Sequence, residues 1–300
     1  MRSKTLGVAV FLIIMLLAAG CTSQQAAPET ATPQRPAHAP ISPSMTASEG
    51  TTSALSLPND SEMKVIGMIA GVSWASSADY YRYMNEKAQN DLGGLHSARV
   101  LMYSIEFDEF SKQERLADAG DWEPLNNTLV DSAQRLKRGG ADFIIIGSNT
   151  LNSRADLIEE KTGLMVLRIY DATGAKVNRS GFTKVALLGT KYTMEQPFYR
   201  DALEQKYGVA IVIPNATERD YINTVIFDEL CRNEIRNESR DGFVRIINRL
   251  ADEEGAQGVI LGCTEIPLLI HQGDVTVPVF DTTRIHAEAA VDYALGRTSP

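Results

Sequence analysis

Two segments of this 300-residue chain repeat each other at a fixed offset, and each ends in a small nucleophilic side chain. Residues 140–148, GADFIIIGS, align without a gap to residues 255–263, GAQGVILGC. Such an apolar run is typical of a buried parallel strand that presents a side chain at its carboxyl end. Open α/β sheets bind ligands at those ends. We therefore expect Ser148 and Cys263 to face each other across a cleft, where a hydroxyl and a thiol could transfer protons on both faces of one small molecule.

Strand and helix signals alternate along the rest of the chain from Met63 onward. This alternation indicates parallel sheets with right-handed crossovers. The predicted fold class is α/β, with two similar small domains whose parallel sheets face each other across a cleft. We place the first domain at residues 62–168, completed by residues 278–300, and the second domain at residues 169–277.

The first 21 residues have the pattern of an export signal. Arg2 and Lys4 form a basic start, and residues 6–19 are apolar. This stretch is shorter than the ~20 residues of a spanning helix and fits the core of a secretory signal. The ending LAAGC resembles the lipobox of bacterial-type lipoproteins, which implies cleavage before Cys21 and lipidation of that residue.

Residues 22–61 are rich in Ala, Thr, Pro, Ser and Gln and hold few large apolar side chains. Such a segment buries too little surface to offset its ordering entropy, so we expect a disordered tether. Together with a lipid on Cys21, it predicts a protein of the cell envelope that is anchored to a membrane and faces the periplasm or the exterior.

Charge and cysteine content exclude several function classes. The net charge is −9 and no block of Lys and Arg stands out, so nucleic acid is not an expected partner. Three Cys do not make a disulfide scaffold, although the sequence leaves a Cys231–Cys263 bridge open, and that bridge would block the proposed site. The four His lack metal-ligand spacing, and no metal is expected.

Polar residues follow the first of the two repeated segments. In Gly147-Ser148-Asn149-Thr150, the polar side chains can cap a helix that starts just beyond them. The first backbone N–H groups of a helix have no internal partner, so this terminus suits a carboxylate. By itself, the cluster is better explained as a good helix cap.

The second segment continues as Gly262-Cys263-Thr264-Glu265. A thiol at a helix N-terminus predicts a lowered pKa and a reactive thiolate. Glu265 could poise that thiol or cap the turn. The alternative is a buried, inert Cys, which is common in protein cores.

At this point the sequence resembles a known family. Residues 63–296 resemble the aspartate/glutamate racemase family of cofactor-independent amino-acid racemases, whose superfamily also holds hydantoin racemases and arylmalonate decarboxylases. The stretches that carry the resemblance are IGMIAGVSW (66–74), GGLHSARVL (93–101), SNT (148–150), VALLGTKYTMEQPFYR (185–200), LGCTEIPLL (261–269) and PVFDTTRIHAEAAV (278–291).

The resemblance implies a two-base racemisation of aspartate or glutamate that needs no cofactor. Ser148 and Cys263 fall on the two bases, one removing the α-proton and the other returning a proton to the opposite face. Asn149, Thr150 and Thr264 would hold the α-carboxylate.

The resemblance also implies further residues around the site. Thr190 and Lys191 are expected partners of the side-chain carboxylate, and Gln113 is a weaker one. Glu265 and His286 would support the site without touching the substrate. Because the family is often dimeric, a homodimer is the expected assembly.

The chain departs from the family at the first base. Most members carry Cys where this chain has Ser148, and His where it has Asn152. A hydroxyl is a much weaker acid than a thiol and a poor resting base, so we expect asymmetric catalysis in which Cys263 abstracts readily and the reverse reaction is slow. Two alternatives stay open: an envelope-anchored amino-acid binding protein, or another superfamily lyase such as an arylmalonate-type decarboxylase.

Overall fold

The computed structural model describes residues 63–298. The predicted signal peptide, the lipidation of Cys21 and the tether of residues 22–61 lie outside the described residues. Among the helices between residues 63 and 298, none has the length and apolar character needed to cross a membrane.

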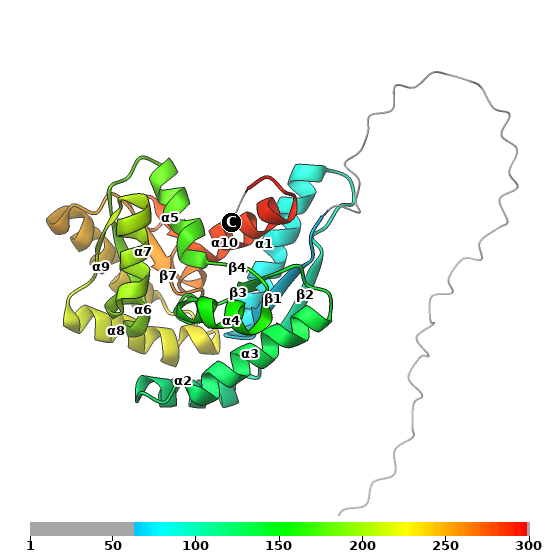
Figure 1. Ribbon diagram of the computed structural model, residues 1–300. Helices are drawn as coiled ribbons and strands as arrows, with labels where there is room; N and C mark the ends of the chain where they lie inside the picture. Colours follow the sequence, from blue (N-terminus) through cyan, green and yellow to red (C-terminus); the bar gives the residue numbers. More distant parts are fainter. Residues whose placement is uncertain (1–62, 299–300) are drawn as a thin grey trace, which may run out of the picture. The chain divides into compact units, whose positions relative to one another are not determined.

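Two four-stranded parallel sheets form the centre of the fold (Figure 1). The first sheet has the order β2-β1-β3-β4, with β1 (Ile66–Ala70), β2 (Val100–Ser104), β3 (Phe143–Ile146) and β4 (Val166–Leu167). The second has the order β6-β5-β7-β8, with β5 (Lys184–Gly189), β6 (Ala210–Val212), β7 (Val259–Gly262) and β8 (Val279–Asp281). This arrangement confirms the predicted α/β fold class.

The repeat in the sequence is a repeat in topology. β3 and β7 take the same third place in their sheets, between the strands that begin each half and the strands that end it. Both are completely buried, as a parallel strand covered on both faces should be. Their carboxyl ends lead to Ser148 and Cys263, so the two nucleophiles occupy equivalent positions.

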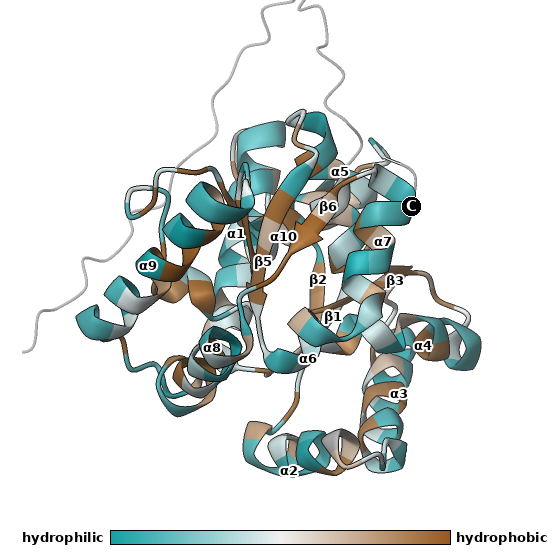
Figure 2. Cartoon of the chain, turned by 90° about the vertical axis from the view of Figure 1, so that its left-hand side faces the viewer, coloured by the Kyte–Doolittle hydropathy of each residue, from teal (hydrophilic) through white to brown (hydrophobic). Residues whose placement is uncertain are grey.

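Helices cover both faces of each sheet, and Figure 2 shows apolar residues concentrated on the strands and on the inner helix faces. The helices are α1 (Trp74–Leu92), α2 (Phe107–Asp118), α3 (Glu123–Arg138), α4 (Ala155–Thr162), α5 (Ile169–Arg179), α6 (Lys191–Glu195), α7 (Pro197–Tyr207), α8 (Ala216–Asp228), α9 (Asn237–Glu254) and α10 (Thr282–Ala294). Short 3-10 helices are η1 (Thr150–Arg154), η2 (Leu230–Arg232) and η3 (Ile266–Leu268). Side chains of α2, α3 and α4 pack on one face of the first sheet, and those of α1 and α10 pack on the other.

The end of the chain is divided between the two halves, which corrects the prediction that residues 278–300 complete the first domain. β8 pairs with β7, with Val279 beside Val259 and Phe280 beside Ile260, and so belongs to the second sheet. Only α10 returns to the first half, where its small residues Ala287 and Ala290 join the core beside α1. β8 thus pairs with an apolar strand of the second sheet, whereas α10 packs its alanine face into the core of the first half, beside α1.

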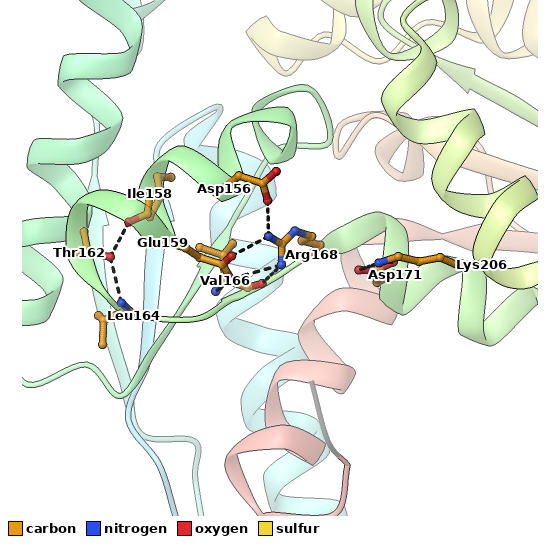
Figure 3. Close-up of polar contacts among 9 residues, drawn as sticks. All are labelled: Asp156, Ile158, Glu159, Thr162, Leu164, Val166, Arg168, Asp171 and Lys206. Atoms are coloured by element: carbon orange, nitrogen blue, oxygen red, sulfur yellow. Dashed lines mark hydrogen bonds and ion pairs between the residues drawn. The ribbon is translucent and has the colours of Figure 1, made fainter.

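The chain crosses between the halves at Arg168, which lies between β4 and α5. Its guanidinium pairs with Asp156 at 2.5 Å and with Glu159 at 2.7 Å, both on α4 (Figure 3). Three residues further on, Asp171 of α5 binds Lys206 of α7 at 3.0 Å (Figure 3). These ion pairs attach the crossing segment to a helix of each half.

Candidate active site

Ser148 and Cys263 line one pocket between the carboxyl ends of the two sheets. Ser148 is 8% exposed and Cys263 is 7% exposed. The structure therefore brings together the two nucleophiles that the sequence pairs. The cavity measures about 30 Å³. That is room for about two water molecules, so an amino acid enters only if the halves or the lining side chains move.

The glycine before each nucleophile is required by the neighbouring strand. A Cβ on Gly262 would lie 2.6 Å from Leu187 Cδ1 and 3.0 Å from the carbonyl oxygen of Leu188. A Cβ on Gly147 would lie 2.8 Å from Met68 Cε. The Gly-nucleophile pairs of the repeat thus reflect close strand packing just before the site.

Cys263 is hydrogen-bonded to a buried carboxylate. Its thiol donates to Glu265 Oε2 at 3.0 Å, and the Thr264 hydroxyl donates to the same oxygen at 3.0 Å. Glu265 is 4% exposed. The sequence-based expectation that Glu265 could poise the thiol therefore has a direct geometric basis.

The other oxygen of Glu265 is bound by the opposite half of the protein. Oε1 accepts hydrogen bonds from the Ser73 amide at 3.1 Å, the Ser73 hydroxyl at 3.0 Å and the Ser76 hydroxyl at 2.9 Å. An ionised carboxylate only accepts hydrogen bonds, so this surrounding set of donors suits it. Sequence reasoning did not identify Ser73 or Ser76, although two serines at the start of α1, directly after a buried strand, were the available signal.

The environment of Cys263 corrects the prediction of a lowered thiol pKa. Burial, and next the negative charge of Glu265, raise the pKa of Cys263 well above its usual value. The following helix, η3, begins only at Ile266 and is a single short turn, so it offers little compensating dipole. The resting side chain is a thiol.

Ser148 has a different environment. Its hydroxyl oxygen accepts a hydrogen bond from the Leu151 amide at 3.4 Å, and within residues 63–298 no carboxylate or imidazole binds that hydroxyl. Asn152 donates to the carbonyl oxygens of Ile146 at 3.2 Å and Ser148 at 2.7 Å. Its own carbonyl accepts from the Ile169 amide at 2.9 Å. Asn152 thus ties the end of β3 to the start of α5.

Three of the predicted binding residues lie in the pocket wall: Asn149, Thr150 and Thr190. Asn149 Nδ2 donates to the Thr282 hydroxyl at 3.0 Å, while its buried Oδ1 has no partner among the described groups. The Thr150 hydroxyl lies 3.2 Å from that of Thr190 and 3.1 Å from that of Thr193. The hydroxyl cluster therefore joins Thr150 of the first half to Thr190 and Thr193 of the second half. The free carbonyl of Asn149 belongs to the residue just before Thr150.

Thr264 also lines the pocket, but its hydroxyl is already engaged. It donates to Glu265, as described above, and lies 3.2 Å from the Ser76 hydroxyl. Its hydroxyl proton is directed to Glu265, and the binding of a carboxylate by Thr264 stays a prediction.

Two predicted residues do not reach the pocket. The ammonium of Lys191 pairs with Asp220 at 2.5 Å, and Lys191 lines a neighbouring chamber instead. Gln113 lies on α2, a helix that the sequence analysis missed, and it is the next residue, Glu114, that lines the pocket. Neither residue lines the pocket of Ser148 and Cys263, and their binding of a side-chain carboxylate stays a prediction.

His286 serves the fold rather than the pocket. Its Nδ1 lies 2.9 Å from the Tyr80 hydroxyl and its Nε2 lies 2.8 Å from the carbonyl oxygen of Leu167. Nε2 must carry the proton to donate to that carbonyl, so Nδ1 accepts from Tyr80. Burial lowers the pKa of His286 to about 4, and the ring is neutral at pH 7.

A second thiol lines the pocket. Cys231 follows α8 in η2 and is unbridged, as is Cys263. Burial, followed by the charges of Glu265 and Glu114, raises its pKa. Within residues 63–298 no three His, Cys, Asp or Glu side chains are grouped so as to hold a metal ion.

Comparison with known proteins gives the family. Residues 69–290 match the model described as Asp/Glu/Hydantoin racemase. The chain belongs to this family. A Yersinia pestis structure assigned as an Asp/Glu racemase is 46% identical with a TM-score of 0.70, covering 78% of this chain and 100% of that chain.

Two further relatives agree with this assignment. The structure of an aspartate racemase homologue from Pyrococcus horikoshii OT3 is 36% identical with a TM-score of 0.66, covering 77% of this chain and 99% of that chain. The broad specificity amino-acid racemase RacX of Bacillus subtilis (strain 168) is 21% identical over 243 residues, which is 78% of this chain and 100% of RacX.

Proposed function

We propose that this member of the family is a cofactor-independent racemase of aspartate or glutamate that transfers protons at Cα between Ser148 and Cys263. The observation that carries the proposal is the hydrogen bond from the Cys263 thiol to Glu265, in the same pocket as Ser148. Because the thiol pKa is raised, the thiol needs an acceptor for its own proton before it can act as a base, and Glu265 is that acceptor.

In the proposed relay, every proton that leaves one group is accepted by another. As the Cα–H bond breaks, its proton binds Cys263 Sγ while the original thiol proton moves to Glu265 Oε2, and the electron pair stays on Cα and its carboxylate. Ser148 then gives its hydroxyl proton to the opposite face of Cα. Solvent reprotonates the Ser148 oxygen and takes the extra proton from Glu265, which restores the starting state.

The pocket supplies partners for the α-ammonium group and the α-carboxylate of the substrate. The unpartnered Oδ1 of Asn149 is an acceptor and suits the α-ammonium group rather than the α-carboxylate. The hydroxyls of Thr150 and Thr190 can donate to the carboxylate. Donors preorganised in a pocket that excludes water stabilise the developing negative charge more strongly than water does.

Isotope exchange tests this proposal. We expect L- or D-aspartate or glutamate to acquire deuterium at Cα in deuterated water with no added cofactor, and Cys263→Ala to abolish the exchange. Ser148→Ala should retain exchange from the enantiomer whose proton faces Cys263 but lose inversion. Tight binding without any exchange would instead support an amino-acid binding protein, and release of carbon dioxide from arylmalonates would support a decarboxylase.

A further inference from the structure

A second, larger cavity adjoins the catalytic pocket. This outer chamber measures about 680 Å³ and lies among residues of α2, α3, η1, α6 and α8. Four residues line both cavities: Glu114, Thr150, Thr190 and Phe227. A ligand whose α-carbon lies between Ser148 and Cys263 can therefore extend past the two threonines into the chamber. Its volume is that of an ordinary small-molecule site.

The chamber contains an arginine whose hydrogen-bonding capacity is largely unused. The Arg154 guanidinium lies over the Trp122 ring, with Cζ 3.7 Å from the ring centroid. One terminal nitrogen donates weakly to the Tyr192 hydroxyl at 3.4 Å, and the buried Nε has no partner. In the part of the chain that the structure describes, Arg154 forms no ion pair with a carboxylate.

The other charged groups of the chamber differ from Arg154 because they have partners. Lys191 pairs with Asp220, and Glu195 binds Arg219 at 2.8 Å. A guanidinium packed against an indole keeps its planar fork of donors, which suits the two oxygens of a carboxylate. Arg154 is therefore the group of the chamber best prepared to bind an anion.

The geometry points to a subsite for a distal carboxylate: the protein accepts α-amino acids whose side chain is longer than that of glutamate and ends in a carboxylate, as in a γ-glutamyl dipeptide. The glutamyl Cα lies between Ser148 and Cys263, the peptide unit passes Thr150 and Thr190, and the terminal carboxylate binds Arg154 beside Trp122. This inference rests on the proposed racemase function, because that function fixes where the α-carbon lies.

Exchange kinetics with two substrates test the subsite. The rate of deuterium exchange at the glutamyl Cα is measured for γ-L-glutamylglycine and for L-glutamate, using the full chain and Arg154→Met, which keeps an apolar stem over Trp122. We expect kcat/KM for the dipeptide to fall by about 10- to 100-fold, as for a lost hydrogen bond to a charged group, and that for glutamate by less than about threefold. Arg135→Met is the matched control, since Arg135 also stacks on a ring, that of Tyr103, but on the exposed surface.

A binding measurement separates failure of the subsite from failure of the racemase. Calorimetry with Cys263→Ala, alone and combined with Arg154→Met or Arg154→Lys, reports dipeptide binding without turnover. Binding that is lost in the Met variant and partly kept in the Lys variant supports the subsite even if the wild type exchanges no substrate. If glutamate exchanges but the dipeptide neither binds nor exchanges, or if Arg154→Met weakens both substrates equally, the subsite is overturned and the racemase remains.

Discussion

The two flanks of the pocket begin alike and end differently. Ser148 and Cys263 follow equivalent strands and equivalent glycines, yet Cys263 donates to the buried carboxylate of Glu265, whereas within residues 63–298 the Ser148 hydroxyl accepts only from a backbone amide. The strands therefore set position, and the residues just beyond them set proton affinity. Glu265 stands two residues after one nucleophile, and Asn152 stands four residues after the other, where it is used to hold backbone.

Replacing Cys263 by serine, so that both flanks carry a hydroxyl, should have the largest effect on Cα exchange. With Cys263→Ser we expect Cα exchange from both enantiomers of the substrate to fall by about 10³-fold, since proton transfer by a positioned base contributes that order of acceleration. Deuterium incorporation followed by NMR measures the rates. Retention of more than a tenth of the wild-type rate would show that the thiol is not the base on this flank.

Removing only the acceptor behind the thiol should have the next largest effect. Glu265→Gln keeps the shape of the side chain, but its neutral amide cannot take up the proton of the Cys263 thiol. We expect kcat to fall by roughly 10²-fold with little change in KM. Ser76→Ala, which removes one of several donors to Glu265, is the milder control. A Glu265→Gln protein that stays folded and keeps its full kcat would contradict the relay.

The pH dependence of stability tests His286, which belongs to neither flank of the pocket. His286 has a folded pKa of about 4, below its unfolded value of 6.5, so its neutral form stabilises the fold above pH 6.5 and that contribution is lost as pH falls toward 4. We expect about 2 kcal/mol to be lost between pH 7.5 and pH 5. Urea unfolding at several pH values checks this, and His286→Gln should remove that part of the slope. An unchanged slope would mean that His286 is not its source.

Restoring a thiol on the weaker flank should have the smallest effect. With Ser148→Cys we expect kcat/KM for inversion to rise by about 10-fold, because a thiol is a stronger acid than a hydroxyl. The rise should be equal from either enantiomer, since the equilibrium constant of 1 between enantiomers ties the two kcat/KM values together. Initial rates from each enantiomer at low substrate concentration, measured by polarimetry, check this, and an unchanged rate would show that the Ser148 hydroxyl does not limit inversion.

The sequence predicts the parts of the site that depend on local pattern. The repeat locates β3, β7 and the two nucleophiles, because apolar runs that end in Gly report a buried strand directly. It does not predict that Ser73 and Ser76 bind Glu265, because those residues are separated by about 190 positions and meet only when two halves pack together. An isolated serine pair carries no signal of its distant partner.

Long-range packing also decides the partners of Lys191 and Arg154, which the local sequence pattern does not give. Lys191 stands next to a predicted binding threonine, but the position of Asp220 on α8 decides where its ammonium goes. The partners of Arg154, which are Trp122 and Tyr192, likewise come from other parts of the chain. Local pattern gives the type of side chain at each position, and long-range packing gives its partner.

The hydrogen bonds to Glu265 come from both halves of the protein. This links the entry of substrate into the pocket to the reactivity of the Cys263 thiol. Substrate needs the cavity to widen, and widening by separation of the sheets would pull Ser73 and Ser76 away from the carboxylate that accepts the thiol proton. The proton acceptor is then complete only around an enclosed substrate, so an open molecule would expose an unprepared thiol to solvent. A single buried carboxylate would in this way time the chemistry to the closed state.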